Sequence, residues 1–351
     1  MTSTTQKLRV VVYGTAHSHA PGKVRALLDS PAVELVGVCE PDTAQRERAA
    51  GNPVYARQRW IESAQEFLGD PSVAAVCVEG AEGKCAALAR ECIAAGKHIW
   101  YDKPVGDFEA FRWMTETARE RRLHIQMGYM LRYSTAFQRV AEWLRQGLLG
   151  ELFAVRGHMS RFDAPAARGR DPVPGGIAFQ LAPHMMDQAL WLFGARPKKV
   201  TSFLRNDATP ALPEHADNTL VVLEFGRAAA GAGNRPGVGG GGGMAMIDIA
   251  AMEASPATRR FEVYGTKGSA IVVEPFEPGT RIRLALEEAG GGYARGEQLV
   301  EVEAAPRGVT FPRELASFVA TIRGEQAPDR SLDHELLVEE TLHRAIGNLP
   351  A

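Results

Sequence analysis

Short apolar runs alternate with amphipathic stretches along the first third of the chain. Each run is rich in β-branched or aromatic residues and is bounded by turn residues, which is typical of a buried strand. The stretches between the runs repeat their apolar residues at helical spacing. The pattern predicts strands at 8–14, 33–40, 73–78, 98–101 and 124–128, and helices at 21–29, 43–50, 84–95 and 107–121. Strands of this kind that alternate with helices indicate an α/β fold with a parallel, doubly wound sheet.

The pattern changes after Gly150, where helices become scarce and strands follow one another. One amphipathic helix at 134–147 precedes the change, and another at 183–193 interrupts the strands. The predicted strands cover 151–161, 198–206, 217–226, 244–253, 259–264, 269–274, 281–286 and 297–303. This succession is typical of an α+β domain with a large, mostly antiparallel open sheet.

The length of the chain, 351 residues, exceeds what one hydrophobic core usually supports. We therefore predict two domains, 1–126 and 127–351. Residues 227–243 are so rich in glycine that burial does not offset their ordering entropy, which predicts a flexible loop. Two helices close the chain, within 312–323 and 333–346, and we expect them to pack back toward the N-terminal domain.

Composition excludes several classes of function. The formal net charge is −2 and no basic stripe is present, so we expect no nucleic-acid partner. No apolar run approaches the ~20 residues that a membrane helix needs, and the first residues have no signal-peptide pattern. The four cysteines form no C-x-x-C pair, which favours a reducing, cytoplasmic location with Cys39 and Cys77 as core residues.

The strand at 98–101 runs directly into Asp102-Lys103-Pro104. An ammonium group at the end of a parallel strand lies at the carboxyl edge of the sheet, where open α/β sheets bind ligands. Lys103 is therefore a candidate for the chemistry of the protein. The alternative is an ordinary surface cation at the end of a strand.

Residues 14–19 stand where a dinucleotide-binding turn, G-x-G-x-x-G, is expected after a first strand. Only Gly14 matches, because Ala16 and His19 replace the other two glycines. The second predicted strand ends at Glu40, whose carboxylate can accept hydrogen bonds from ribose hydroxyls and repel a 2′-phosphate. We therefore expect NAD rather than NADP, although an acid at a strand end is also compatible with simple solvation. The predicted cofactor-binding residues are Gly14, Ala16, His17, Ser18, His19, Glu40, Asp102 and Lys103.

The His17-Ser18-His19 pattern also occurs in metal-dependent hydrolases, which are built on eight-fold barrels. Here the alternating pattern of strands and helices stops near residue 128. We therefore expect no metal, and assign these histidines to a phosphate-facing loop or to ordinary loop polarity.

A second cluster of polar residues lies in an otherwise apolar segment, at Gln180, His184 and Asp187. His184 and Asp187 are three residues apart and share one face of the predicted helix. A lone histidine in such a place is commonly structural, so His184 becomes a catalytic candidate only together with Lys103. His158 and Arg161, on the first strand after Gly150, are candidate substrate contacts or solvated strand residues.

Together these segments resemble the glucose–fructose oxidoreductase / inositol dehydrogenase (Gfo/Idh/MocA) family along nearly the whole chain. The resemblance rests on AGKHIWYDKP at 95–104, MGYMLRYSTAF at 127–137, GG-x3-Q-x3-H-x2-D at 175–187 and FEVYGTKGSA at 261–270.

The resemblance implies an N-terminal Rossmann domain, a C-terminal domain whose sheet forms a homo-oligomer (dimer or tetramer), and NAD(P)-dependent redox chemistry on a sugar, polyol or inositol. Lys103 matches the family lysine near nicotinamide and substrate, His184 the acid–base histidine, and Asp187 a substrate-contacting acid. The resemblance also implies a cis Lys103–Pro104 bond, an isomer found in only ~5–6% of X–Pro bonds. We hypothesise that His184 takes the hydroxyl proton while Lys103 stabilises the alkoxide.

The chain departs from the family pattern at Asp102, where the family has glutamate, and at Gln180, where it has aspartate. We count Gln180 with Lys103 and His184 as the catalytic set, but an amide orients an imidazole without supplying charge. Two alternatives therefore stay open: a regulatory protein that binds NAD or sugar without turnover, and a lyase or glycosidase that uses transient oxidation.

Overall fold

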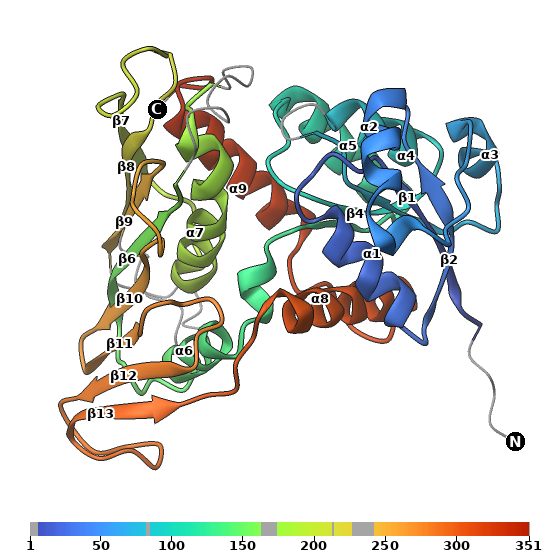
Figure 1. Cartoon of the computed structure of the whole chain (residues 1–351). Coiled ribbons are helices and arrows are strands. Elements are labelled where there is room, and N and C mark those ends of the chain that lie inside the picture. The colour runs from blue at the N-terminus through green and yellow to red at the C-terminus, as the bar shows by residue number, and fades with distance from the viewer. Residues whose placement is uncertain (1–5, 82–84, 163–173, 213, 227–241, 351) are drawn as a thin grey trace, which may run out of the picture. The chain divides into compact units, whose positions relative to one another are not determined.

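The computed structural model describes residues 6–81, 85–162, 174–212, 214–226 and 242–350. The chain divides into two compact units, drawn in Figure 1. The first comprises the chain up to Tyr129 together with Arg307–Glu339, and the second comprises Met130–Pro306 with the chain from Glu340 onward. Helix α9 thus begins in the first unit and ends in the second.

The first unit contains a parallel sheet, as the sequence predicts, and this sheet has five strands. All its paired strands are parallel, in the order β2-β1-β3-β4-β5. The chain starts at β1, winds to one side through β2, and then continues on the other side from β3, so the winding reverses at β1. Ligands bind parallel sheets at such a reversal, outside the carboxyl ends of the strands. The strands are β1 (Leu8–Tyr13), β2 (Val33–Cys39), β3 (Ala75–Val78), β4 (His98–Tyr101) and β5 (Ile125–Met127).

The helices of this unit bury apolar side chains. Helix α1 buries Ala20, Val24 and Leu27, and it approaches α8 so closely that a Cβ on Gly22 would meet the Phe311 ring at 2.6 Å. The helices are α1 (Ala20–Asp29), α2 (Thr43–Ala50), α3 (Ala64–Leu68), α4 (Ala86–Ala94), α5 (Phe108–Arg121), α8 (Arg307–Ile322) and α9 (Leu332–Ala345), with a 3₁₀ turn η1 (Pro53–Tyr55).

The second unit contains an eight-stranded sheet in the order β13-β12-β11-β10-β6-β9-β8-β7. All its strand pairs are antiparallel except β6 with β9, which confirms the predicted mostly antiparallel sheet. Helices α6 and α7 lie against one face (Figure 1). The elements are η2 (Met130–Tyr133), α6 (Thr135–Arg145), β6 (Leu152–Ser160), α7 (Ile177–Phe193), β7 (Lys199–Arg205), β8 (Asn218–Phe225), β9 (Gly243–Ala250), β10 (Arg259–Gly265), β11 (Gly268–Val272), β12 (Arg281–Leu286) and β13 (Gly296–Glu301).

Two helix starts differ from the prediction. Helix α7 begins at Ile177, not at residue 183, and α8 begins at Arg307, not at residue 312. Prediction placed a proline in the first turn of each helix, where its missing N–H costs nothing. In the structure Pro183 and Pro312 lie inside the helices. All apolar residues of α7 before Pro183 are buried, and this burial outweighs the hydrogen bond that Pro183 cannot make.

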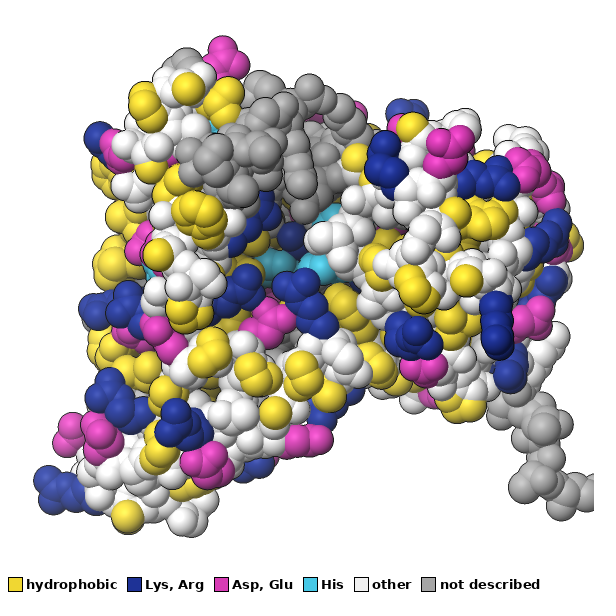
Figure 2. Space-filling view, viewed as in Figure 1, with side chains coloured by type: hydrophobic (Ala, Val, Ile, Leu, Met, Phe, Trp, Pro, Cys, Tyr) yellow, Lys and Arg dark blue, Asp and Glu magenta, His cyan; other side chains and the backbone are white. Residues whose placement is uncertain are grey.

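The structure also bears on several smaller predictions from the sequence. The Lys103–Pro104 bond is cis, as predicted. Cys39 and Cys77 are buried free thiols. Within the described residues, no helix combines the length and the apolarity that a membrane span requires. Figure 2 shows Lys and Arg interspersed with Asp and Glu on the visible surface of each unit, in keeping with the small net charge. Of the predicted flexible loop, residues 227–241 lie outside the described part of the chain.

Helix α8 carries a fully buried carboxyl group, Glu314, under the parallel sheet. Its backbone oxygen accepts a hydrogen bond of 2.8 Å from Gln126 of β5. Burial raises the pKa of Glu314 from 4.5 to about 8, and the nearby cations Lys23 and Arg330 only partly oppose this. The folded protein therefore keeps a proton on Glu314 at neutral pH, whereas the unfolded chain does not.

We predict that Glu314→Gln stabilises the protein in alkaline solution. Because the folded pKa is raised, wild-type stability falls as pH rises from about 4.5 to about 8. The neutral amide removes this loss, so the gain in unfolding free energy is on the order of 1–3 kcal/mol at the upper end and vanishes at the lower. Urea unfolding at several pH values measures it. The exposed Glu120 supplies the control, and an equal effect of Glu120→Gln would contradict the prediction.

Candidate functional site

The polar residues predicted for the first unit lie at the carboxyl edge of its parallel sheet. Gly14 directly follows β1 and Glu40 directly follows β2. Lys103 is the second residue after the end of β4. Gly14 has a φ of +86°, and a Cβ there would lie 2.7 Å from the backbone nitrogen of Gly80. Only glycine permits both this conformation and this approach between the loops after β1 and β3.

Glu40 is tied to the loop that follows β1. Its Oε2 accepts hydrogen bonds from the backbone N–H of Thr15 (2.6 Å) and from the Thr15 hydroxyl (2.8 Å). Its Oε1 accepts the backbone N–H of Asp42 (3.1 Å). Gln45 donates to the Thr15 carbonyl (3.1 Å) and hydroxyl. The carboxylate thus has a fixed position beside the β1–α1 turn, where an acid can meet the ribose of a dinucleotide.

A buried cation, Lys23 of α1, joins the loops of this edge. Its Nζ lies 2.7 Å from Glu79 Oε1 and 3.0 Å from Asp102 Oδ2, and it stacks 4.4 Å from the centre of the Trp100 ring. Lys23 and Glu79 have no exposed surface, and Asp102 has 1%. One ammonium therefore bridges acids that follow β3 and β4.

Two histidines complete the cluster from the β1–α1 loop. His19 Nδ1 lies 3.0 Å from Asp102 Oδ2, and His17 Nδ1 lies 3.6 Å from Glu79 Oε2 and 3.5 Å from Asp102 Oδ2. Both imidazoles are buried, whereas Ala16 and Ser18 are exposed. A cofactor at this loop would therefore meet the backbone and Ser18, and the histidine side chains support the loop from inside.

The charges of the cluster stabilise one another. Burial alone would lower the pKa of Lys23, but Asp102 and Glu79 raise it well above its ordinary value. Burial would raise the pKa of Asp102, yet His17, Lys23 and His19 hold it well below its usual range. The pKa of His17 is raised, because the two carboxylates outweigh its desolvation, and burial lowers the pKa of His19.

Asp102 also fixes the backbone of Lys103. Its Oδ1 accepts the backbone N–H of Lys103 at 2.8 Å. The carboxylate also packs against Gly128, where a Cβ would lie 2.6 Å from Oδ1. The turn that carries Lys103 is thus held by a carboxylate that cannot rotate freely, and Lys103 itself is 4% exposed.

His17, His19 and Asp102 lie close enough together to hold a metal ion. The Lys23 ammonium already pairs with Asp102 and Glu79 in the same cluster. The cluster thus contains its own buried cation, which balances part of the acidic charge that would otherwise favour a metal ion.

In the second unit, α7 carries the other predicted residues. His184 is 3% exposed and Asp187 is fully buried. Both oxygens of Asp187 accept hydrogen bonds of 2.8 Å from the Arg132 guanidinium, which stacks 4.2 Å from the centre of the Trp191 ring. Gln180 lies in the first turns of α7, and its Oε1 accepts a hydrogen bond from Arg161.

His158 lies on the sheet face opposite α7. Its neighbour Gly157 faces α7, since a Cβ there would meet Met185 at 2.7 Å, and side chains alternate along a strand. His158 Nδ1 lies 3.0 Å from Asp248 and Nε2 lies 2.8 Å from Glu253. The hydrogen bond with Asp248 has the largest effect on the pKa of His158 and raises it, and the charge of Glu253 raises it further. The structure therefore does not bring His158 to the face where His184 lies.

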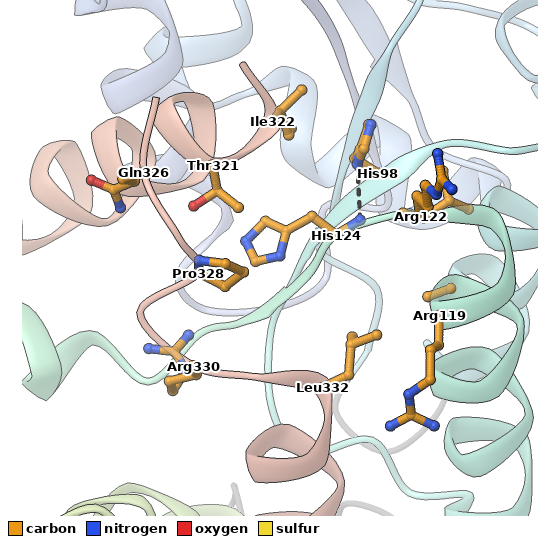
Figure 3. Close-up of a pocket in the computed structure, with 12 residues that line it drawn as sticks. His98, Arg119, Arg122, His124, Thr321, Ile322, Gln326, Pro328, Arg330 and Leu332 are labelled. Atoms are coloured by element: carbon orange, nitrogen blue, oxygen red, sulfur yellow. Dashed lines mark hydrogen bonds between the residues drawn. The ribbon is translucent and has the colours of Figure 1, made fainter. Parts of the chain in front are cut away.

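A cavity of about 390 Å³ opens at the other edge of the parallel sheet, at the amino ends of β4 and β5 (Figure 3). His98 and His124 contribute to its wall, and the His124 backbone N–H donates to His98 Nδ1 at 2.9 Å. Burial lowers the pKa of both histidines to about 4, so both are neutral at neutral pH. None of the predicted site residues lines this cavity.

Sequence reasoning missed the buried charges Lys23 and Glu79. A signal for Lys23 was present, because it falls on the same helical stripe as the buried Ala20, Val24 and Leu27. A charged residue on an apolar stripe indicates a buried partner. Glu79 lies at a strand end, so periodicity gave no sign of its role.

Models of two domains match the chain over most of its described length. The oxidoreductase family, NAD-binding Rossmann fold, matches residues 8–129. The GFO/IDH/MocA C-terminal domain matches residues 137–271.

Individual proteins are similar over part or most of the chain. The rhizopine catabolism protein MocA of Rhizobium meliloti is 29% identical over 175 residues, which are 50% of this chain and 54% of MocA. The chain thus matches about half the length of that relative. Myo-inositol 2-dehydrogenase of Thermotoga maritima is 23% identical over 270 residues, covering 75% of this chain and 73% of that protein.

Among solved structures, GenD2 from gentamicin A biosynthesis, in complex with NAD, superposes with a TM-score of 0.75. The superposition covers 98% of this chain and 94% of GenD2, at 21% identity. At this identity the likeness shows a common fold.

We predict that Lys23→Met destabilises the protein by about 3–5 kcal/mol, because it leaves Glu79 and Asp102 buried without their cation. Urea unfolding near neutral pH measures the loss. Lys199, whose exposed ammonium lies 3.5 Å from Glu224, is the control, since a surface pair contributes roughly 0–1 kcal/mol. A loss no larger than that of Lys199→Met would show that the buried ammonium is dispensable.

Proposed function

Because the chain belongs to the Gfo/Idh/MocA oxidoreductase family, we propose that it is an NAD-dependent dehydrogenase acting on a CH–OH group of a sugar, polyol or inositol. The observation that carries the proposal is the turn after β4, where a buried carboxylate fixes the backbone of Lys103 at the carboxyl edge of the sheet. The names of the similar proteins, one acting on myo-inositol, support the substrate class.

The residues of the β1–α1 loop fit a dinucleotide. Gly14 supplies the tight turn, Ala16 and Ser18 are exposed along the loop, and Glu40 has a fixed place beside it. Bound NAD supplies the hydride acceptor. Because three donors hold Glu40 in position, we propose that its carboxylate binds the ribose hydroxyls and excludes a 2′-phosphate.

In the proposed reaction, His184 removes the proton of the substrate hydroxyl and the Lys103 ammonium stabilises the developing alkoxide. Gln180 orients the imidazole without adding charge. Asp187 is engaged by Arg132, and Arg161 by Gln180, which supports a role in fixing α7 and its surroundings more than direct substrate contact. The position of His158, opposite α7, supports a role outside catalysis.

We also propose that the open face of the eight-stranded sheet joins copies of the chain into a homo-oligomer. Phe203, Met244 and Leu299 are exposed large apolar side chains on three strands of this sheet. Exposed apolar side chains that recur over one sheet are typical of an interaction surface.

The substitution of Gln180 favours a second candidate, a protein that binds NAD and sugar without turnover. A panel of sugars, inositols and polyols with NAD distinguishes the two. NADH formation supports the dehydrogenase, whereas binding without any change in NADH absorbance supports the regulator. Catalysis without net NADH would indicate lyase or glycosidase chemistry.

We predict that Lys103→Ala lowers kcat by about 10²–10⁴ with the substrate found in this panel, because the alkoxide loses its counter-charge. NADH fluorescence titration should show that the variant still binds cofactor. The exposed Lys7, in the same unit, serves as the control in Lys7→Ala. Unchanged turnover in Lys103→Ala would overturn the proposed mechanism.

We predict that Glu40→Ala shifts cofactor preference toward NADP. Removing the carboxylate abolishes its repulsion of a 2′-phosphate, so the ratio of NADPH to NADH affinity rises about tenfold or more. The exposed acid Asp42, which caps α2 with its side chain, is the control as Asp42→Asn. If wild type binds NADPH as tightly as NADH, the assignment of NAD is wrong.

A further inference from the structure

The cavity at the amino ends of β4 and β5 plays no part in the proposed dehydrogenase reaction. Its volume of about 390 Å³ is within the range of small-molecule sites. Its wall comes from the start of β4, the end of α5, the residues before β5, the end of α8 and the segment that leads into α9. All these segments belong to the first compact unit. The described residues that line it include three arginines and neither aspartate nor glutamate.

Two of the three arginines already have an acidic partner. Arg119 pairs with Asp333, and Arg330 Nε lies 2.8 Å from Glu335. The Arg122 side chain is exposed, and within the described ranges its guanidinium has no hydrogen-bond or ion-pair partner. In the described wall of the cavity, Arg122 is therefore the cation that remains for an anionic ligand.

The backbone of Arg122 is strained where a glycine is usual. Arg122 caps the C-terminus of α5 in the left-handed conformation, with φ 57° and ψ 37°. Among the described residues it is the only one other than glycine with a positive φ. Helices commonly end with glycine in this conformation, because a Cβ is disfavoured there. An arginine kept at such a position points to a function of its side chain.

The wall formed by α8 holds a buried hydroxyl group. Thr321 Oγ1 is buried, and the described part of the chain offers it no hydrogen-bond partner. In Figure 3 the Thr321 hydroxyl and the His124 ring point toward one another. Buried hydroxyl groups nearly always bond to a protein group, an ordered water or a ligand. Thr321 therefore marks a place where a polar group of a ligand fits.

The two histidines of the wall supply one donor and one acceptor. His98 Nδ1 accepts the His124 backbone N–H, so this neutral ring carries its proton on Nε2. Gln126 donates its amide N–H to the Glu314 carbonyl, which leaves its Oε1 to accept from His124 Nε2 at 3.4 Å. The neutral His124 ring is then an acceptor at Nδ1. An acceptor and the Thr321 hydroxyl on one cavity wall suit a ligand hydroxyl, which both donates and accepts.

The ends of two helices limit the charge of the ligand. Both α5 and α8 end at this cavity, and the negative ends of their dipoles disfavour more than one negative charge. A carboxylate carries a single charge, and a guanidinium can bind it through two parallel N–H bonds. Part of the wall is apolar and can cover a short carbon skeleton, since it includes Leu123, Ile322 and Leu332.

We propose that this cavity binds a small hydroxycarboxylate. The Arg122 guanidinium pairs with the carboxylate, and the ligand hydroxyl accepts from Thr321 and donates to His124 Nδ1. The site lies at the amino edge of the parallel sheet, whereas Lys103 lies at the carboxyl edge. The inference therefore stands apart from the proposed reaction.

Three matched compounds test the chemistry of the site by NMR titration of protein labelled with ¹⁵N-histidine. They are 2-hydroxybutyrate, butyrate, which lacks the hydroxyl, and 1,2-butanediol, which lacks the charge. The imidazole signal that disappears in His124→Gln identifies His124. In wild type this signal should shift with 2-hydroxybutyrate, and Kd should be several-fold higher for butyrate and about tenfold or more higher for the diol.

Two variants test the residues without removing a structural contact. Arg122→Gly places glycine where the backbone favours it, so the melting temperature should stay near that of wild type. Its Kd for 2-hydroxybutyrate should nevertheless rise about tenfold or more. Thr321→Val keeps the shape of the side chain and removes the buried hydroxyl. It should raise Kd for 2-hydroxybutyrate several-fold and leave Kd for butyrate unchanged.

Arg121→Gln is the matched control, because Arg121 is the preceding residue of α5 and donates to the Ala94 carbonyl (2.8 Å) outside the cavity wall. It should bind 2-hydroxybutyrate as wild type does. An unchanged Kd in Arg122→Gly, or no shift of the His124 signal with 2-hydroxybutyrate, overturns the inference. Equal affinity of wild type for butyrate or for inorganic phosphate would show an unspecific anion site and would overturn it as well.

Discussion

One buried ion pair network holds the carboxyl edge of the parallel sheet together. The Lys23 ammonium of α1 lies between Glu79 and Asp102 with no exposed surface, so one cation joins this helix to the connections that follow β3 and β4. Charges removed from water in this way need excellent geometry, because the desolvation cost of each ion is several kcal/mol. The loops at this edge are therefore fixed by electrostatic pairing where a glycine-rich turn would rely on close backbone packing.

This constraint explains how the chain can depart from the usual dinucleotide turn. Ala16 and His19 replace two glycines, yet His19 turns inward to Asp102 and leaves Ala16 and Ser18 at the surface of the loop. Asp102 also accepts the backbone N–H of Lys103, so the same carboxylate holds both the β1–α1 loop and the turn that carries Lys103. A shorter acid at this position is thus compatible with an ordered Lys103, because Lys23 and His19 hold it.

Buried carboxyl groups recur around the same sheet with different protonation. Asp102 is held ionised by neighbouring cations, whereas Glu314 and Glu339 have pKa values raised to about 8 and about 7 by burial. All three carboxyl groups are buried, so the difference between their pKa values does not follow from the depth of burial. It follows from the charged groups that surround each of them. A charge that is paired keeps its ordinary state in a low dielectric, and one that is not takes up a proton.

The local pattern of apolar and polar residues determined most helices and strands of this protein. Buried strands need apolar runs, and helices that are buried on one side need an apolar stripe. The strands β4 and β12 and the helix α2 have their predicted bounds, and the cis bond before Pro104 follows from the family motif. Tertiary structure decided what local rules could not. Pro183 and Pro312 lie inside helices, and His158 lies on the sheet face opposite α7. Asp187 forms an ion pair with Arg132. Lys23 and Glu79 become an ion pair only when distant segments meet, since the energy of a buried charge depends on partners that sequence spacing does not encode.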